Sequence, residues 1–354
     1  MNEVLSKRYT TKIFYENSYR LHDNYDRKKV FYLANRLDYF KVKSIIKMSS
    51  IKRSDQYSIY IHDSGLFGLL LCSWWSKFSN VYSITFDYHD WIPWEISYQI
   101  GKRIKSPKIV KILSNMTESF FKKALGSISI DNLVGISESQ IEELKKDFKL
   151  LGSKHLVVPN TRNKLSKKRS INDDEFSGVL WIGNVMKGRD LDILCTYINK
   201  YNDRRKTNVY LYIIGNIFDK DYFRSLESLG HIKYLDAFRN DLDVFEKIKN
   251  YNVAGFFYGW DDTYETGINK IASPNKAYSY INLGIPTVMG KHMCSLRASF
   301  ENSTDSIFWI DGYTDFEKSI DYIKVNYSTI INDFDVQTKW EDDIQKDMTN
   351  FFLE

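Results

Sequence analysis

The sequence predicts an α/β protein made of two doubly wound halves, each a parallel sheet flanked by helices. Short apolar runs alternate with amphipathic segments almost from end to end, which is typical of parallel strands and their crossover helices. The 354-residue chain also exceeds the size at which one core usually stops growing. A polar stretch without periodicity, residues 160–174, separates the two series of apolar runs. We therefore expect a central cleft, with ligands at the carboxyl ends of the strands.

The first half contains six candidate strands. They are residues 11–15, 44–46, 58–61, 81–86, 133–136 and 155–158. Ser137 and Gln140 have the spacing of a capping box, which predicts that a helix begins there. The longest apolar run, residues 65–75, is about half as long as a membrane span and is interpreted as a core helix.

The second half repeats the alternation, and a helical pattern follows each strand. The expected strands are residues 178–182, 209–214, 232–235, 253–258, 286–289 and 306–310. Beyond them Trp340, Ile344, Met348 and Phe351 recur at helical spacing, which predicts a C-terminal helix. The predicted domains are residues 1–162 and 163–335, with the helix of residues 336–354 packing back toward the first domain.

Composition limits the class of protein. A hydrophobic content of 43% and a charged content of 27% indicate a folded soluble protein. Residues 1–8 are polar and precede no apolar core, so we expect a cytoplasmic protein. Cys72, Cys195 and Cys294 are far apart and predict buried free thiols rather than disulfides or a zinc site.

Charge gives a weaker indication of partners. The basic clusters 102–105 and 122–123 could meet anionic lipid head groups at the inner face of a membrane, and solvated helix faces explain them equally well. The charge is otherwise mixed and no nucleic-acid motif is present, so no nucleic-acid partner is expected. The oligomeric state stays open.

Residues 271–288 combine a helix start with a following buried strand. Ser273 is a suitable N-cap, Pro274 fits the first helical position, and Gly284 with Pro286 closes the helix. Lys276 then lies in the first turn, where the helix dipole disfavours a cation by roughly 0.3–1 kcal/mol. A bound anion would reverse this penalty, which predicts a phosphate site; an ordinary solvated helix start is the alternative.

Three segments precede this helix start in the second half. Residues 181–190 contain a Gly-rich turn with Lys187, residues 213–216 end the next strand at a glycine, and residues 234–238 lead from a strand into a helix starting at Asn240. In this order they resemble the donor domain of GT-B-fold glycosyltransferases, which carry two Rossmann-like domains and transfer sugars from nucleotide donors. The resemblance covers nearly the whole chain in the order of strands and helices, and its specific motifs are confined mostly to residues 178–290 and to one strand end of the first half.

The resemblance implies roles for two sets of residues. Donor phosphates would be bound by Gly183, Asn184, Lys187, Ser273, Pro274, Asn275 and Lys276, and the base and ribose by Gly215, Ala237, Phe238, Ser279 and Glu265. Many retaining members carry a ribose-binding glutamate where this chain has Ser279. A related group of bacterial polysaccharide transferases lacks it and has a Ser-x-x-Lys start, which this chain resembles more closely. Glu265 could supply a carboxylate, or it could be a solvated loop residue.

Two His-Asp pairs follow strands of the first half and are candidates for the acceptor side. We expect Asp90 to accept the acceptor's proton, ahead of His89, Asp63 and His62; all four could instead cap their loops. No three ligands have metal-binding spacing, so neither a metal nor another cofactor is expected.

The predicted function is metal-independent sugar transfer from a nucleotide sugar to a hydroxyl of a glycan, glycolipid or glycoprotein. UDP-sugars are favoured as donors, and CMP- or GDP-sugars are possible. The alternative is a non-catalytic GT-B-like subunit of a glycosylation complex.

Overall fold

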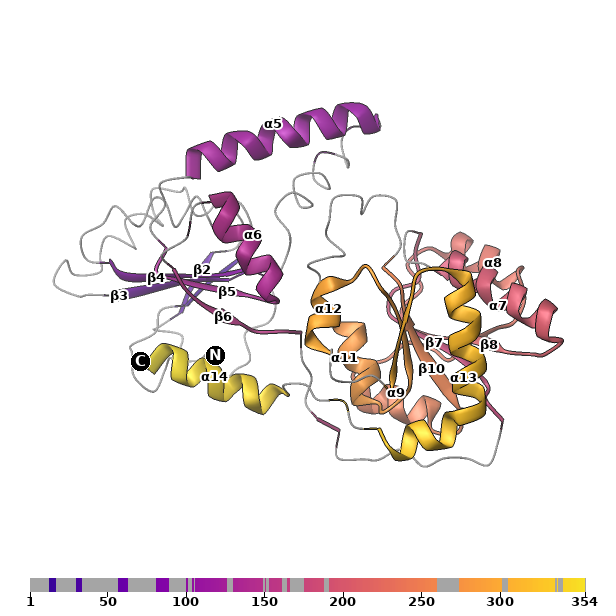
Figure 1. Ribbon diagram of the computed structural model, residues 1–354. Coiled ribbons are helices and arrows are strands. Elements are labelled where there is room, and N and C mark those ends of the chain that lie inside the picture. The colour runs from indigo at the N-terminus through magenta and orange to yellow at the C-terminus, as the bar shows by residue number, and fades with distance from the viewer. Residues whose placement is uncertain are drawn as a thin grey trace. The chain divides into compact units, whose positions relative to one another are not determined.

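The chain divides into two compact units in the computed structural model (Figure 1). Unit 1 comprises Met1–Pro159 with Ile344–Glu354, and unit 2 comprises Asn160–Asp343. The structure describes residues 13–16, 30–33, 57–62, 81–88, 100, 104, 106–125, 130–148, 150, 153–160, 164–165, 175–187, 191–259, 274–300, 305–334, 336 and 340–353.

Unit 1 contains a two-stranded and a four-stranded parallel sheet, the latter in the order β3-β4-β5-β6. The strands are β1 (Ile13–Glu16), β2 (Val30–Leu33), β3 (Tyr57–His62), β4 (Val81–Tyr88), β5 (Asn132–Gly135) and β6 (Lys154–Val157). The helices are α5 (Pro107–Leu125), α6 (Glu138–Phe148) and α14 (Glu341–Leu353), which belongs to this unit from Ile344 onward. Five of the six expected strands are confirmed, and β2 was not expected. The candidate strand 44–46 and the apolar run 65–75 lie outside the described residues.

The predicted start of helix α6 is confirmed by the capping hydrogen bond of Ser137. The backbone N–H of Gln140 donates to the Ser137 hydroxyl at 3.2 Å. The Gln140 side-chain oxygen accepts from the Ile136 N–H at 2.8 Å, one residue earlier than a standard capping box would have it. The side chains of Gln140 and Ser137 therefore accept hydrogen bonds from the backbone N–H groups of Ile136 and Gln140 at the helix start.

Unit 2 is a six-stranded parallel sheet in the order β12-β11-β10-β7-β8-β9. Its strands are β7 (Gly178–Ile182), β8 (Tyr210–Ile214), β9 (Ile232–Tyr234), β10 (Val253–Phe257), β11 (Thr287–Gly290) and β12 (Ile307–Ile310). The helices are α7 (Leu191–Arg205), α8 (Lys220–Glu227), α9 (Asp241–Ile248), α11 (Asn275–Asn282), α12 (Cys294–Ser299) and α13 (Tyr313–Asn332). All six expected strands are confirmed. Counted within the unit, the strand order is that of the doubly wound dinucleotide-binding fold.

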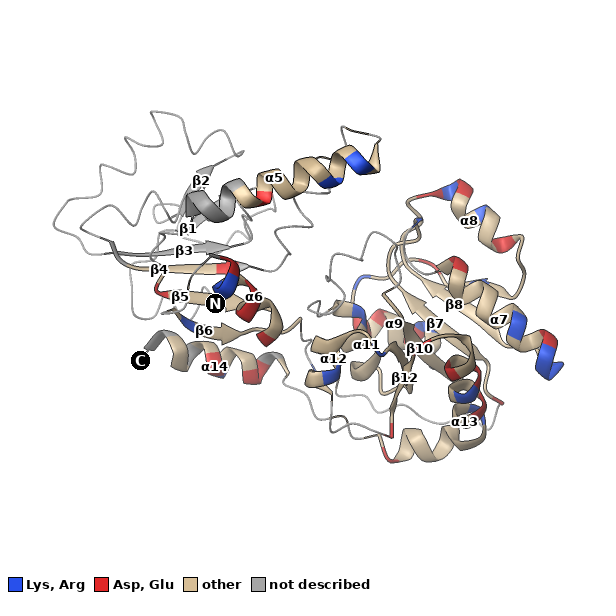
Figure 2. Ribbon diagram, turned by 45° about the horizontal axis from the view of Figure 1, so that its top comes forward, with Lys and Arg blue, Asp and Glu red and all other residues tan. Residues whose placement is uncertain are grey.

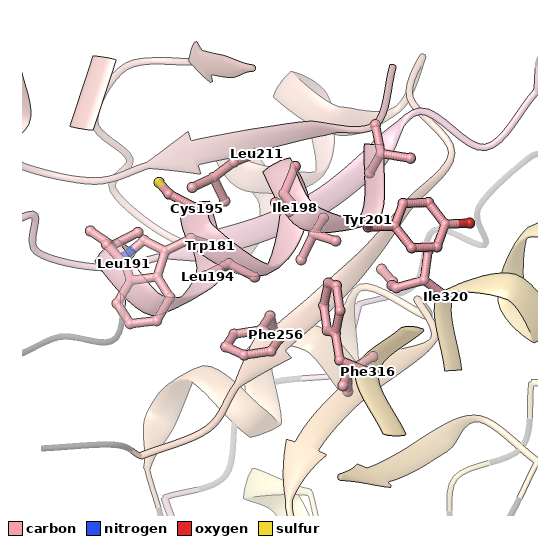
Figure 3. Packing of buried hydrophobic residues seen from close by; sticks show 14 of the residues in the cluster. Trp181, Leu191, Leu194, Cys195, Ile198, Tyr201, Leu211, Phe256, Phe316 and Ile320 are labelled. Carbon is pink, nitrogen blue, oxygen red and sulfur yellow. The ribbon is translucent and has the colours of Figure 1, made fainter. Parts of the chain in front are cut away.

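The sheet of unit 2 is buried on both faces, so its central strands are apolar throughout. Trp181 of β7 packs on the face covered by α7 and α13, where Leu194, Phe256 and Phe316 join it (Figure 3). Leu180 of β7 points to the opposite face and its cluster. This is why β7 is an uninterrupted apolar run rather than an alternating one.

The C-terminal helix forms as predicted, with Ile344 and Met348 buried along its stripe. The expectation of buried thiols holds for Cys195 and is wrong for Cys294, which is exposed at the start of α12; Cys72 lies outside the described residues. Within the described ranges, no helix is both long and apolar enough to cross a membrane.

Candidate functional site

The centre of the site is the boundary between β7 and β10, the two neighbouring strands at which the chain order of unit 2 reverses. The helix after β7 covers one face of the sheet, and α11, which follows β10, contributes to the cluster on the other face. Doubly wound sheets bind ligands at this switch point, beyond the carboxyl ends of the strands. The residues that end β7 and β10 are therefore the first candidates.

Two glycines let the ends of β7 and β8 approach each other closely. Gly183 has φ +133° and Gly215 has φ +156°. A Cβ atom on Gly215 would overlap the carbonyl oxygen of Gly183 and lie 2.6 Å from its carbonyl carbon. The pairing continues past the strands, because the Val185 N–H donates to the Asn216 carbonyl at 2.9 Å. Only glycine fits at position 215, where any side chain would collide with the backbone of Gly183.

Lys276 of α11 reaches back over this glycine turn. A Cβ atom on Gly183 would lie 2.8 Å from Lys276 Cε and 3.3 Å from its Nζ. The ammonium nitrogen lies 3.2 Å from the centroid of the Trp181 ring and 5.5 Å from that of Phe257. Because these rings belong to β7 and β10, the charge is located at the switch point.

The start of α11 differs from the prediction by one residue. Pro274 is the N-cap, with φ −69° and ψ 137°, rather than the first helical residue, and its side chain makes no capping hydrogen bond. The proline carbonyl accepts from the Ala277 N–H at 3.1 Å, which makes Lys276 the second helical residue. Ser273, the expected N-cap, lies outside the described residues. The predicted end of the helix is confirmed, since Gly284 has φ +64°.

Tyr280 fixes α11 to the strands beneath it. Its hydroxyl accepts from the Ile182 N–H and donates to the Phe256 carbonyl, each at 3.1 Å, and so bridges β7 and β10. A side chain on Gly255 would overlap the Tyr280 ring, so this glycine makes room for it. Burial raises the pKa of the Tyr280 hydroxyl, which therefore keeps the proton that it donates.

A second buried anchor joins α11 to α9. The Ser279 hydroxyl and the Asn282 side-chain amide each donate to one carboxylate oxygen of Asp241, both at 2.9 Å. Asn282 in turn accepts from the Leu165 N–H at 2.9 Å. Asp241 is 8% exposed. A carboxylate therefore lies within hydrogen-bond distance of residue 279, contributed by α9 rather than by α11.

The contact between Asp241 and Ser279 was not predicted from the sequence. The sequence predicted the helix start at Asn240, which is confirmed because the Asn240 side chain accepts from the Asp243 N–H at 3.0 Å. Nothing in the spacing of Asp241 and Ser279, 38 residues apart, indicated that they meet. The assignment of Ser279 to the ribose stays a prediction.

The segment expected to meet the base lies next to Gly215. The Gly215 N–H donates to the Asp236 carbonyl at 3.1 Å, and the Tyr234 hydroxyl donates to the Gly215 carbonyl at 2.8 Å. Asp236 has φ +74° and accepts from the Ala237 N–H at 2.7 Å. Ala237 and Phe238 are half-buried. The ends of β7, β8 and β9 and the start of α11 thus share one edge of the sheet.

Of the remaining predicted site residues, three are exposed and the others lie wholly or in part outside the described residues. Asn184 and Lys187 are exposed on the turn after β7, and Asn275 is exposed at the start of α11. Asp63, His89, Asp90 and Glu265 lie outside the described residues, as does the side chain of His62, the last residue of β3. Among the described side chains, no group of three or more His, Cys, Asp and Glu could hold a metal ion.

Comparisons with known proteins identify the fold. No family model and no curated protein matches the sequence. Among solved structures, sucrose-phosphate synthase from Thermosynechococcus elongatus matches with a TM-score of 0.57 at 9% identity, over 99% of this chain and 90% of that chain. Anabaena HepE, solved with UDP and glucose, matches with a TM-score of 0.56 at 11% identity, over 92% and 86%.

A third similar structure is WaaG, a glycosyltransferase involved in lipopolysaccharide biosynthesis. It matches with a TM-score of 0.52 at 10% identity, over 93% of this chain and 88% of that chain. These proteins are GT-B glycosyltransferases with two Rossmann-like domains. At identities this low the likeness establishes architecture rather than activity. The chain has the GT-B fold.

Proposed function

We propose that the protein is a glycosyltransferase that moves a sugar from a nucleotide-sugar donor to a hydroxyl group of an acceptor. The observation that carries the proposal is the place of the Lys276 ammonium. It lies over Gly183 at the switch point of unit 2, in the first turn of a helix whose N-cap residue, Pro274, supplies no side-chain cap. A helix start of this kind attracts anions through its N–H groups and dipole, and the lysine adds a full positive charge.

The leaving nucleoside diphosphate is the anion that fits such a site. In the transfer, the acceptor oxygen forms a bond to the anomeric carbon while the bond from that carbon to the phosphate oxygen breaks. Negative charge then accumulates on the departing phosphate. Lys276, Lys187, Asn184 and the backbone N–H groups of Ser273 and Asn275 stabilise that charge without a metal ion.

The nucleoside lies along the same edge of the sheet in this proposal. The base meets Gly215, Ala237 and Phe238, and Glu265 binds the ribose. Ser279, the other ribose candidate, is 2% exposed and donates its hydroxyl to Asp241, which leaves Glu265 the stronger candidate. UDP is the favoured nucleotide, supported by HepE, a structure of the same fold that was solved with UDP and glucose. CMP and GDP are the alternatives to be tested beside it.

The acceptor is a glycan, glycolipid or glycoprotein hydroxyl held on unit 1. The pairing of β3 with β4, in which His62 lies opposite Asp87, supports this because it brings the segments after both strands to one edge. Those segments contain Asp63 and Asp90. Asp90 takes the hydroxyl proton as general base, with His89, Asp63 and His62 as the next candidates.

A non-catalytic subunit of a glycosylation complex is the second candidate. Ser279 favours it, because a serine stands where many retaining enzymes of this fold carry a glutamate. Such a subunit need not bind a nucleotide, whereas the transferase must. Nucleotide binding and turnover therefore separate the two functions.

A thermal-shift screen with UDP, CMP, GDP and their sugar conjugates tests the proposal. A ligand at one hundred times its Kd stabilises the native state by about 2.7 kcal/mol, which raises Tm by several degrees. We expect the shift with UDP and its conjugates, and we expect it to persist in EDTA. The Asp90→Asn variant should keep this shift and lose transfer. No shift with any nucleotide would overturn the proposal.

A further inference from the structure

The Lys276 ammonium group lies against the faces of two aromatic rings. Its nitrogen is 3.2 Å from the centroid of the Trp181 ring and 5.5 Å from that of Phe257. Helix α11 contains no charged residue besides Lys276 (Figure 2). Gly183 leaves room for the lysine side chain, since a Cβ atom there would lie 2.8 Å from Lys276 Cε. The place of this charge therefore depends on the ring at position 181.

Packing alone does not account for a tryptophan at this position. Trp181 is fully buried in the apolar cluster that also contains Leu191 and Leu194 (Figure 3). Within the part of the chain that the structure describes, its indole N–H has no hydrogen-bond partner, which destabilises the folded state. A phenylalanine would also be apolar and would bury no donor. What the indole adds is the strongest attraction for a cation among the aromatic rings.

We propose that Trp181 is a positioning residue that holds the Lys276 ammonium over the glycine turn before and after a nucleotide binds. A lysine side chain loses rotamer freedom when it is fixed on a ligand, and the ring makes part of this loss occur on folding instead. An ammonium group has three N–H donors, so a phosphate can bind from another side while the ring contact persists. The inference rests on the proposed function and deepens it, since Trp181 acts through Lys276 rather than on the substrate.

A double-mutant cycle on UDP affinity tests the proposal with the full chain. Isothermal titration gives the Kd of wild type, Trp181→Leu, Lys276→Met and the double variant. We expect Trp181→Leu to weaken UDP binding roughly 3- to 30-fold, which is the strength of a cation–π contact expressed as affinity. In the Lys276→Met background the same substitution should leave the Kd unchanged, because the charge that the ring positions is absent.

Two further variants separate the ring contact from packing. Trp181→Phe keeps a ring with a weaker attraction for cations, so its Kd should lie between those of wild type and Trp181→Leu. It is also the smaller change and carries the test if the leucine variant does not fold. Phe316→Leu is the matched control, because Phe316 of α13 is fully buried in the same cluster. It should lower Tm and leave the Kd for UDP unchanged.

Two results would overturn this inference alone. One is that Lys276→Met weakens UDP binding while both Trp181 variants bind UDP as tightly as the wild type or more tightly. The other is that Trp181→Leu weakens binding equally with and without Lys276, which a purely structural role would produce. A wild-type chain that binds no nucleotide would overturn the proposed function as well.

Discussion

Replacing Lys276 with Met tests the phosphate site with the least structural change. Methionine keeps an unbranched side chain that can lie over Gly183 and Trp181, and it removes only the ammonium group. Because the contact with Trp181 is a cation–π interaction, its loss costs about 0.5–2 kcal/mol of stability. The variant should fold, with a small decrease in Tm.

The effect on nucleotide binding should be larger. A hydrogen bond to a charged group contributes about 1.5–3 kcal/mol. At about 1.4 kcal/mol per factor of ten, its loss weakens UDP binding roughly 10- to 150-fold. Turnover should fall on the order of a hundredfold if Lys276 also stabilises the leaving phosphate.

Isothermal titration with UDP measures this difference directly. Lys200→Met is the matched control, because the Lys200 ammonium also stacks on an aromatic ring, 4.0 Å from the centroid of Tyr313, but belongs to α7. It should lower Tm by a similar amount and leave the Kd for UDP unchanged. Equal affinity of wild type, Lys276→Met and Lys200→Met would refute the reasoning.

Three further predictions concern the packing of unit 2. Gly230 has φ +82° and open space around a new Cβ, so Gly230→Ala should lower the free energy of unfolding in urea by about 1–2 kcal/mol. Gly215→Ala should lower it further, because its Cβ also overlaps a backbone carbonyl. Equal decreases for the two variants would contradict the close approach of the strand ends. Ser279→Ala should lower the unfolding free energy by about 1–3 kcal/mol, because a buried carboxylate loses a donor, and an unchanged value would exclude that role. In a Cys72→Ser background, Cys294 should react with a thiol reagent in the native state and Cys195 only after unfolding. Burial raises the pKa of Cys195 from 9.0 to about 12, so its contribution to stability should be lost as the pH rises from about 9 to 12.

The sheet of unit 2 could be predicted well from sequence for a physical reason. A parallel strand covered on both faces needs apolar side chains at every position, and residues 178–182 show that run plainly. The strand β2 (Val30–Leu33) was missed, although strands of the same length such as β5 (Asn132–Gly135) were predicted, so its length does not account for the miss. Local patterns thus identified every strand of unit 2 and, among the described strands of unit 1, all but β2.

The sequence predicted the phosphate-binding residues of the site but not the contacts that hold α11 in place. Lys276 stood out because it broke a local rule at a helix start, and the structure places its ammonium at the switch point. Pro274 was placed one residue too far into the helix, since proline suits both the N-cap and the first turn. The bond between Asp241 and Ser279 depends on tertiary packing of two helices, which no local pattern encodes.

A crystal structure of the protein with UDP is the most direct test of the central claim. A phosphate of UDP should lie within hydrogen-bond distance of Lys276 Nζ and of the N–H groups at the start of α11. Gly183 should then lie directly beneath the phosphate. UDP bound elsewhere on the chain, with the start of α11 empty at saturating ligand, would contradict the account.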